Sequence, residues 1–289
     1  MFDLALSILC SSLIFVIFKL FKVYKVETFY AIIANYVVAC AVGLLCYQGD
    51  VNVIGIVEKP WFWGTFALGL LFIIVFNLMA ATSQKLGVSV ASVATKMSLV
   101  LPVLFGVYMY KEVLGPLKII GILLALAAVY FASIKENSTK FRIGALLLPF
   151  LVFVGSGVID ISLAYFQKEF IANKELQIFS ATVFASAAII GITFILIKIT
   201  GKPLKMNFRN VLAGIALGVP NYFSIFFLLR ALQNETLNSA SIFTINNVAI
   251  VMFSTLLGIL LFKEKLNLKN WGGIVLAIIS IILVARSGG

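Results

Sequence analysis

Long apolar runs separated by short polar stretches make up almost the whole chain. Each run holds about 20 residues, the length that an α-helix needs to cross the hydrocarbon core of a bilayer. The pattern therefore predicts an all-α polytopic membrane protein. The expected spans are 4–21, 28–47, 61–83, 87–112, 116–134, 141–166, 177–199, 211–229, 239–264 and 269–285.

Two of these runs are copies of one another, the run 87–112 and the run 239–264. They align when 152 is added to each number of the first. The matching pairs are Ser89 with Ser241, Leu104 with Leu256, Gly106 with Gly258, Lys111-Glu112 with Lys263-Glu264, and Gly121-Ile122 with Gly273-Ile274. Such a duplication predicts two five-helix repeats, 1–137 and 138–289. Because each repeat has an odd number of spans, the repeats are inverted, as in many secondary transporters.

The composition excludes soluble classes of protein. Hydrophobic residues make up 62% of the chain and charged residues 11%. The short loops leave no room for a separate catalytic or nucleotide-binding domain. The net charge of +11 lies mostly in loops, where basic residues orient a membrane protein, so we expect no nucleic-acid partner. With no histidine and three cysteines without metal-ligand spacing, we expect neither a metal nor a cofactor.

The placement of basic residues also predicts the orientation of the chain. Lysines and arginines in the loops after the odd-numbered spans outnumber those on the other side two to one. The positive-inside rule then places these loops in the cytoplasm and both termini outside. We expect a multi-pass protein of a bacterial plasma (inner) membrane, as a monomer or homodimer, with the lipid bilayer and a small-molecule substrate as partners.

Lys96 is the sharpest candidate for a functional residue, because it lies near the middle of the span 87–112. A lysine at that depth costs roughly 3 kcal/mol or more on insertion scales, so it should face protein or water. Ser92 lies one turn earlier on the same helical face. This pair would suit a carboxylate or phosphate. The alternative interpretation is a structural ion pair with an acid on a neighbouring span.

Asp160 is the only acid deep in a predicted span, and it follows the flexible segment 155–157. A buried carboxylate is the best candidate for a proton carrier. It could equally be the counter-ion of Lys96. The two interpretations are compatible, because a pair can be structural when the transporter is empty and exchanged for substrate when it is loaded.

Further polar side chains are candidates for lining a substrate site. Thr244 and Asn247 share a face of the span 239–264, whereas Asn246 points elsewhere and is expected to bond a neighbouring helix. The other candidates are Asn221, Tyr222 and Asn77.

Prolines, small residues and terminal glutamates point to structure as much as to function. Pro102, Pro149 and Pro220 each predict a kink, either static or a hinge. Small residues four apart let helices approach closely, inside the bundle or at a dimer face. These pairs are Gly121 with Ala125, Gly273 with Ala277, and Gly214 with Gly218. Glu112 and Glu264 are expected to be interfacial caps or gate ion pairs.

The repeated pattern resembles the drug/metabolite transporter superfamily, and within it the ten-span EamA-type carriers. The segments 102–125 and 251–277 carry the resemblance, with a glycine and a glutamate closing one span and a glycine in the next. The match departs at Pro102, which is Ser254 in the second copy. The resemblance implies ten helices around a central cavity and carriage of a small metabolite without ATP. In the plastid phosphate-sugar branch, span 4 also carries a substrate-binding lysine.

Three functions fit these observations to different degrees. The first is a secondary transporter of a small polar or anionic metabolite, such as an amino acid, organic acid or phosphorylated compound, working in efflux and coupled to protons. The second is a lipid-headgroup flippase on the same scaffold, with Lys96 holding a phosphate. The third is a membrane-embedded transferase, against which the lack of histidine, of a cysteine pair and of a carboxylate dyad argues.

Overall fold

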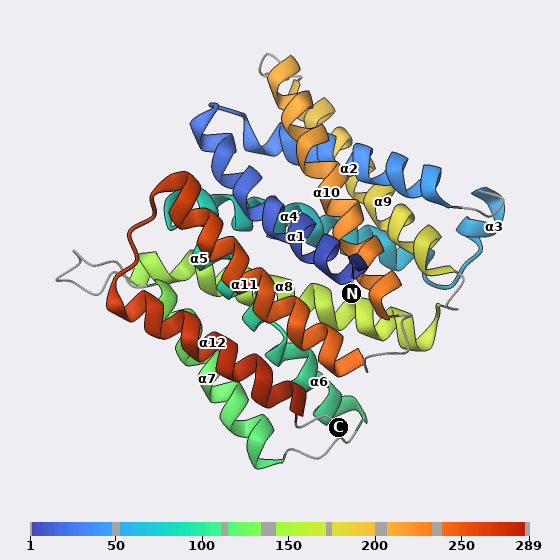
Figure 1. Cartoon of the computed structure of the whole chain (residues 1–289). Helices are drawn as coiled ribbons and strands as arrows, with labels where there is room; N and C mark the ends of the chain where they lie inside the picture. The colour runs from blue at the N-terminus through green and yellow to red at the C-terminus, as the bar shows by residue number, and fades with distance from the viewer. Residues whose placement is uncertain are drawn as a thin grey trace.

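The computed structural model is a bundle of helices (Figure 1), and it contains no strand within the residues that it describes. These residues are 2–47, 53–110, 115–133, 143–171, 175–199, 207–232 and 239–286. The helices of the first half are α1 Phe2–Val23, α2 Thr28–Cys46, α3 Val53–Val57, α4 Phe62–Lys85, α5 Val88–Met97, α6 Val100–Tyr110 and α7 Pro116–Ser133. Those of the second half are α8 Ile143–Glu169, α9 Leu176–Ile199, α10 Phe208–Leu232, α11 Ser239–Phe262 and α12 Leu268–Arg286.

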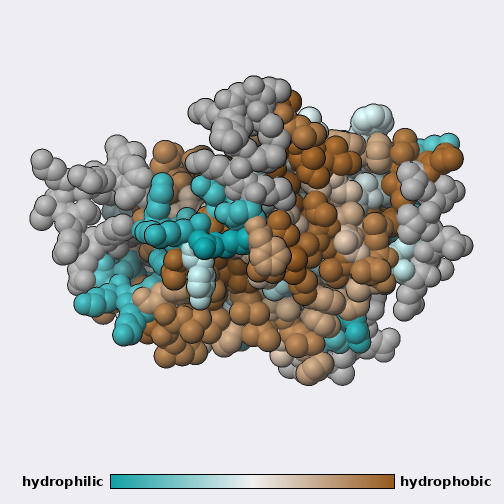
Figure 2. Space-filling model, turned by 90° about the horizontal axis from the view of Figure 1, so that it is seen from above, coloured by the Kyte–Doolittle hydropathy of each residue, from teal (hydrophilic) through white to brown (hydrophobic). Residues whose placement is uncertain are grey.

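The predicted spans have counterparts in the structure. Within the described ranges, eight segments are long and apolar enough to cross a membrane, and α7 and α12 supply two shorter apolar helices. The surface seen in Figure 2 is largely apolar, with polar side chains gathered toward one end. The prediction of an all-α polytopic membrane protein is confirmed. The division into repeats stays a prediction, and its boundary at 137/138 lies outside the described residues.

The fourth predicted span is not one continuous helix, which corrects the expectation of a single element over 87–112. It consists of α5 and α6, separated at Ser98 and Leu99. Pro102 explains the break, because it has no N–H to donate to the carbonyl of Ser98 four residues earlier. The N–H of Leu101 bonds that carbonyl instead, at 2.9 Å, in a tighter turn. Pro149 and Pro220, by contrast, lie inside the continuous helices α8 and α10.

The small-residue pairs pack helices together inside the bundle. Figure 1 shows α7 and α12 side by side, and a Cβ atom at Gly273 would lie 2.4 Å from the backbone nitrogen of Ala132. Across the same contact, the Ser280 hydroxyl donates a hydrogen bond to the Gly121 carbonyl at 2.7 Å. On α10, a Cβ atom at Gly218 would lie 2.8 Å from the carbonyl oxygen of Asn35 on α2. These glycines therefore serve helix packing within one chain.

An aromatic cluster joins α1, α2, α4 and α9. The ring of Tyr36 stacks on Phe184 with 6.2 Å between centroids, and Phe76 packs edge-on against Phe18 at 5.6 Å. Tyr36, Phe18 and Phe184 are almost wholly buried. Aromatic pairs of this kind add about 0.5–1.5 kcal/mol beyond the burial of their area. This core holds α4 in place beside the broken helix.

Candidate functional site

The break between α5 and α6 brings the two deep charges of the sequence into one place. Lys96 lies in the last turn of α5, and Asp160 lies in α8, which packs against both α5 and α6. Ser98, in the break itself, donates a hydrogen bond to Oδ2 of Asp160 at 3.0 Å. Its hydroxyl also lies within bonding distance of the Thr95 carbonyl. The tighter turn between α5 and α6 thus supplies the hydroxyl that orients the carboxylate.

Lys96 and Asp160 act on each other electrostatically without touching. Each contributes a Coulombic attraction at the other's position. Ion pairs between described residues include Lys19–Glu264, Lys59–Glu175 and Arg230–Asp3 but not Lys96–Asp160, so the charged atoms of Lys96 and Asp160 do not approach within 4.0 Å. Lys96 is half-buried and Asp160 is exposed, although each lies within a membrane-spanning segment. Lys96 makes no hydrogen bond or ion pair with the described residues. A cation and an anion held in this way can each be approached by a ligand.

The hydroxyls of α5 near Lys96 donate hydrogen bonds to carbonyl groups of their own helix. Ser92 is fully buried, and its hydroxyl donates to the carbonyl of Ser89 at 3.0 Å. Thr95 donates to the carbonyl of Ala91 at 2.9 Å. The structure therefore places Ser92 one turn from Lys96, as predicted, but with its donor used locally.

On α11 the two adjacent amides have different environments. Asn246 is buried, and its Oδ1 accepts a hydrogen bond from Ser7 on α1 at 3.3 Å. Asn247 is half-buried and makes no hydrogen bond with the described residues. The next residue, Val248, packs in an apolar cluster with Met97 of α5, so Asn247 lies on a helix adjacent to the lysine. The side chain of Thr244 lies outside the described residues.

Asn221 and Tyr222 belong to a different part of the bundle. The amide of Asn221 donates to Oδ1 of Asn35 on α2 at 3.1 Å, and both side chains are buried. The ring of Tyr222 lies 3.1 Å from where a Cβ atom at Gly43 would be. Within the described part of the chain, the Tyr222 hydroxyl has no hydrogen-bond partner. Both residues thus join α10 to α2, and the structure does not bring them to Lys96.

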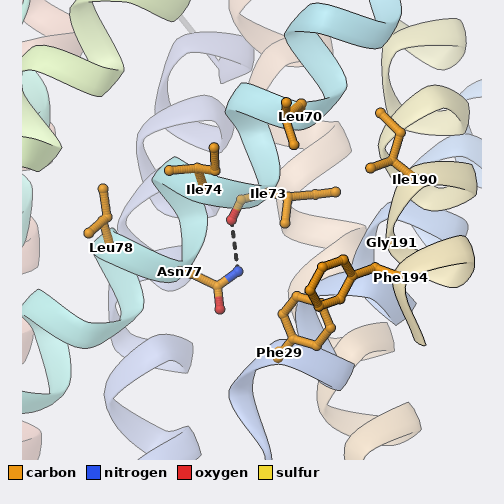
Figure 3. Close-up of a pocket in the computed structure, with 9 residues that line it drawn as sticks. All are labelled: Phe29, Leu70, Ile73, Ile74, Asn77, Leu78, Ile190, Gly191 and Phe194. Atoms are coloured by element: carbon orange, nitrogen blue, oxygen red, sulfur yellow. Dashed lines mark hydrogen bonds between the residues drawn. The ribbon is translucent and has the colours of Figure 1, made fainter. Parts of the chain in front are cut away.

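Asn77 lies in a groove on the side of α4 (Figure 3). The groove has a volume of about 440 Å³, and Asn77 is its one polar lining side chain. The amide nitrogen of Asn77 donates to the carbonyl of Ile73 in its own helix at 2.7 Å. Because neither Lys96 nor Asp160 lines this groove, Asn77 is separate from the charged pair.

Sequence reasoning missed Ser98 and the partner of Glu264. The signal for Ser98 was a small polar residue four positions before Pro102, where the freed carbonyl predicts a turn. The sequence predicts Glu264 as an interfacial cap or a gate ion pair without naming a partner, and its carboxylate accepts a hydrogen bond from the backbone N–H of Val88 at 2.8 Å. Lys19 lies 3.5 Å from the same carboxylate. Glu112, its counterpart in the repeat, lies outside the described residues.

Comparisons with known proteins match a family model to the second half of the chain and two further proteins to almost all of it. A model of the EamA-like transporter family matches residues 142–286, which is half of the chain. An uncharacterised protein of Haemophilus influenzae is 28% identical over 291 residues, which cover 97% of this chain and 96% of that protein. A solved crystal structure aligns with a TM-score of 0.61 at 18% identity, covering 99% of this chain and 97% of the other, and shows the shared fold.

The family match agrees with the apolar helical segments and with the broken helix beside two charges, because all three are typical of a membrane transporter. The chain belongs to the EamA-like transporter family, and it is an integral, multi-pass membrane transporter of the drug/metabolite transporter superfamily.

Proposed function

We propose that this transporter is a secondary carrier of a small polar or anionic metabolite, of the amino acid, organic acid or phosphorylated class. The observation that carries the proposal is the arrangement of Lys96 and Asp160, which share one site without forming an ion pair. The carrier works by alternating access between two inverted five-helix repeats. Its direction is efflux, and Asp160 couples it to protons.

The preference for an anionic group follows from the position of Lys96. Its ammonium lies within a membrane-spanning segment and makes no hydrogen bond or ion pair with the described residues. A charge in that position is costly unless a partner of opposite sign approaches it. A carboxylate or phosphate on the substrate supplies that partner through a charge-assisted hydrogen bond. Asp160, held by Ser98, stays at a distance and remains able to exchange a proton.

The broken helix gives this site both polarity and a point of movement. In many transporters, substrate and coupling ions bind beside discontinuous membrane helices. The short turn at Ser98 and Leu99 lies two residues beyond Lys96. A rotation of α6 about this turn would change the backbone at Ser98, the hydrogen-bond partner of Asp160, without moving the body of α5. This links occupation of the site to the change in access.

Ligand-induced stabilisation of the purified transporter tests the proposal. Melting temperatures are measured for wild type, Lys96→Ala and Lys96→Arg against amino acids, organic acids, phosphorylated sugars and nucleotides. A ligand stabilises the folded state in proportion to the logarithm of its concentration above its dissociation constant. We expect one anionic class to stabilise wild type, Lys96→Arg to retain part of the shift, and Lys96→Ala to lose it. Equal shifts in wild type and Lys96→Ala would contradict a substrate role for Lys96.

A lipid flippase on the same scaffold fits the described residues less well than a carrier of a water-soluble metabolite. It would need the lysine that holds a headgroup phosphate to open onto the apolar groove that holds the lipid tails. Among the described residues, the groove is lined by α2, α4 and α9, and Lys96, Ser98 and Asp160 take no part in it. The separation of the charged pair from the groove therefore favours a water-soluble substrate.

A further inference from the structure

The apolar groove arises where two helices that touch at one end separate toward the other. A Cβ atom at Gly69 of α4 would lie 2.7 Å from the backbone nitrogen of Ala187 in α9, so the backbones are in contact there. One turn earlier, the hydroxyls of Thr65 and Ser186 hydrogen-bond at 2.8 Å. From this point α4 and α9 diverge, and the groove opens between them (Figure 3). The groove is thus a fixed consequence of helix packing.

The lining of the groove is almost entirely hydrocarbon. It is formed by Phe29, Leu70, Ile73, Ile74, Asn77, Leu78, Ile190, Gly191 and Phe194. The rings of Phe29 and Phe194 meet edge-on at 5.7 Å at one end. A slot of this shape and lining accepts a flexible apolar chain better than a polar solute.

The groove is continuous with the surface that meets the bilayer. Ile74 is 47% exposed, Leu70 49% and Phe194 58%, all on membrane-spanning segments. Exposed apolar side chains on membrane-spanning helices are suited to contact with lipid tails, which are as apolar as they are. The groove is therefore filled from the bilayer, and its occupant is an acyl chain rather than a water-borne ligand.

A basic residue stands beyond the groove on the same face of α4. Lys85 follows Leu78 by seven residues and Ile74 by eleven, so all three share one side of the helix. The rise of an α-helix places Lys85 about 10 Å beyond Leu78, at the helix end. Lys85 is exposed, and so is Lys25, which precedes Phe29 at the start of α2. A lipid whose tail lies in the groove would carry its headgroup to these cations.

We propose that the groove between α4 and α9 binds one acyl chain of an anionic phospholipid, with its phosphate beside Lys85. The tail fills the slot between Ile74 and Phe194, and the cation selects the headgroup charge. The bound lipid fills the space between α4 and α9. It therefore stabilises α4, the helix that packs beside α5. This site is separate from the charged pair, and its test does not depend on the substrate.

Native mass spectrometry tests the site directly. Protein purified in mild detergent is mixed with phosphatidylglycerol or phosphatidylcholine, and retained lipid is counted for wild type, Ile74→Trp and Lys85→Gln. Ile189→Trp is the matched control, because Ile189 is 54% exposed on α9 and does not line the groove. We expect wild type and the control to retain phosphatidylglycerol about fivefold more than phosphatidylcholine, as one basic residue near a phosphate allows.

The two variants test the contact with the lipid tail and the contact with the headgroup separately. Ile74→Trp should lose most of the retained lipid of both kinds, because the indole occupies the slot. Lys85→Gln should keep a lipid but lose most of the preference for phosphatidylglycerol. Equal losses from Ile74→Trp and Ile189→Trp would overturn the groove as the site, and an unchanged preference in Lys85→Gln would overturn the headgroup contact. Leu70 lies one turn before Ile74 on the same face of α4 and also lines the groove. If Ile74→Trp fails to fold, Leu70→Trp therefore repeats the test of the tail contact.

Discussion

The carboxylate of Glu264 caps the N-terminus of α5, because its Oε1 accepts a hydrogen bond from the backbone N–H of Val88 at 2.8 Å. Oε2 also accepts from the hydroxyl of Ser89 at 3.3 Å. Two glycines make room for this contact, since a Cβ atom at Gly87 or Gly258 would lie within 3.0 Å of the carboxylate. Gly87 additionally has a φ of 124°, which other residues rarely adopt. The end of α11 thus fixes the start of the broken helix.

Glu264→Ala should destabilise the transporter, because α5 loses its cap and the favourable charge at its positive end. A cap of this kind is worth about 1–2 kcal/mol. The measurement is thermal unfolding in detergent, and Lys265→Ala is the matched control one residue away. Glu264→Gln should fall between the two, since the amide oxygen still accepts from Val88. A melting temperature of Glu264→Ala equal to that of Lys265→Ala would show that the cap contributes nothing to stability.

Pro102→Ala should make the fourth span continuous and slow transport. Alanine restores the N–H that can bond the carbonyl of Ser98, and an interior proline costs a helix about 3 kcal/mol, so stability should stay equal or rise. We expect a transport rate about tenfold lower, read in proteoliposomes. Pro149→Ala is the control, because Pro149 lies in the unbroken helix α8. If Pro102→Ala transports at the wild-type rate, the break has no part in the change of access.

The membrane fold could be predicted from the sequence because lipid imposes one rule on every span. Backbone groups in hydrocarbon must bond within the helix, so apolar length alone marks the elements. The predicted bounds of 116–134 and 239–264 lie close to those of α7 and α11. The exception is the span 87–112, which the repeat predicts as one element and which the structure divides into α5 and α6 just before Pro102, where the sequence predicts a kink. The short α3 is too brief and too near a polar stretch to leave a periodic signal.

The candidate site was harder to predict, because composition does not tell which polar groups face each other. Lys96 and Asp160 stood out as deep charges, and the structure places them within electrostatic reach. Asn221 and Asn246 carry the same chemistry as Asn247, yet they bond Asn35 and Ser7 on neighbouring helices. Only the packing of the helices decides whether such an amide faces a site or bonds a neighbouring helix. The cap at Glu264 likewise depends on a contact 176 residues apart in sequence.

Asp160→Asn should separate accumulation from exchange. An amide preserves the hydrogen bond from Ser98 but cannot carry a proton. In proteoliposomes with an imposed proton gradient, we expect the variant to lose accumulation and to keep the exchange of substrate across the membrane. Ser98→Ala is the companion variant, since it removes the partner and leaves the carboxylate, and it should keep accumulation at a reduced rate. Accumulation by Asp160→Asn would show that another group, or none, carries the proton.

Gly273→Leu should destabilise the bundle, whereas Gly272→Leu should not. A Cβ atom at Gly273 would lie 2.4 Å from the backbone of Ala132, while Gly272 has nothing within 4 Å. Forcing α12 away from α7 should cost about 1–3 kcal/mol, as overpacking does elsewhere. Thermal unfolding measures this difference. If the glycine instead served a dimer face, Gly273→Leu would lower the mass of the complex in light scattering and leave the stability of the monomer unchanged.

Lys59→Met should remove a contribution to stability that depends on pH. The contribution comes from the contact between Lys59 and Glu175, at the end of the bundle opposite Glu264. The hydrogen bond from Lys59, 2.7 Å from Oε1 of Glu175, holds the pKa of that carboxyl below its ordinary value, with a lesser contribution from Trp61 and against the effect of burial. A depressed pKa means that the pair stabilises the fold fully above the unfolded value of about 4.3, and that this stability is lost as the pH falls through the folded value.

The melting temperature of wild type should therefore fall more than that of Lys59→Met between pH 6 and acid conditions near the ordinary carboxyl pKa and below. The difference should be small and should shrink in high salt, because the Lys59 side chain is 42% exposed and solvent screens the pair. Lys25→Met, which changes the net charge equally on an exposed residue at the other end, separates this contact from a general charge effect. Parallel pH curves for wild type and both variants would mean that the pair adds no pH-dependent stability, since only a carboxyl whose pKa differs between the folded and unfolded chain can bend the curve.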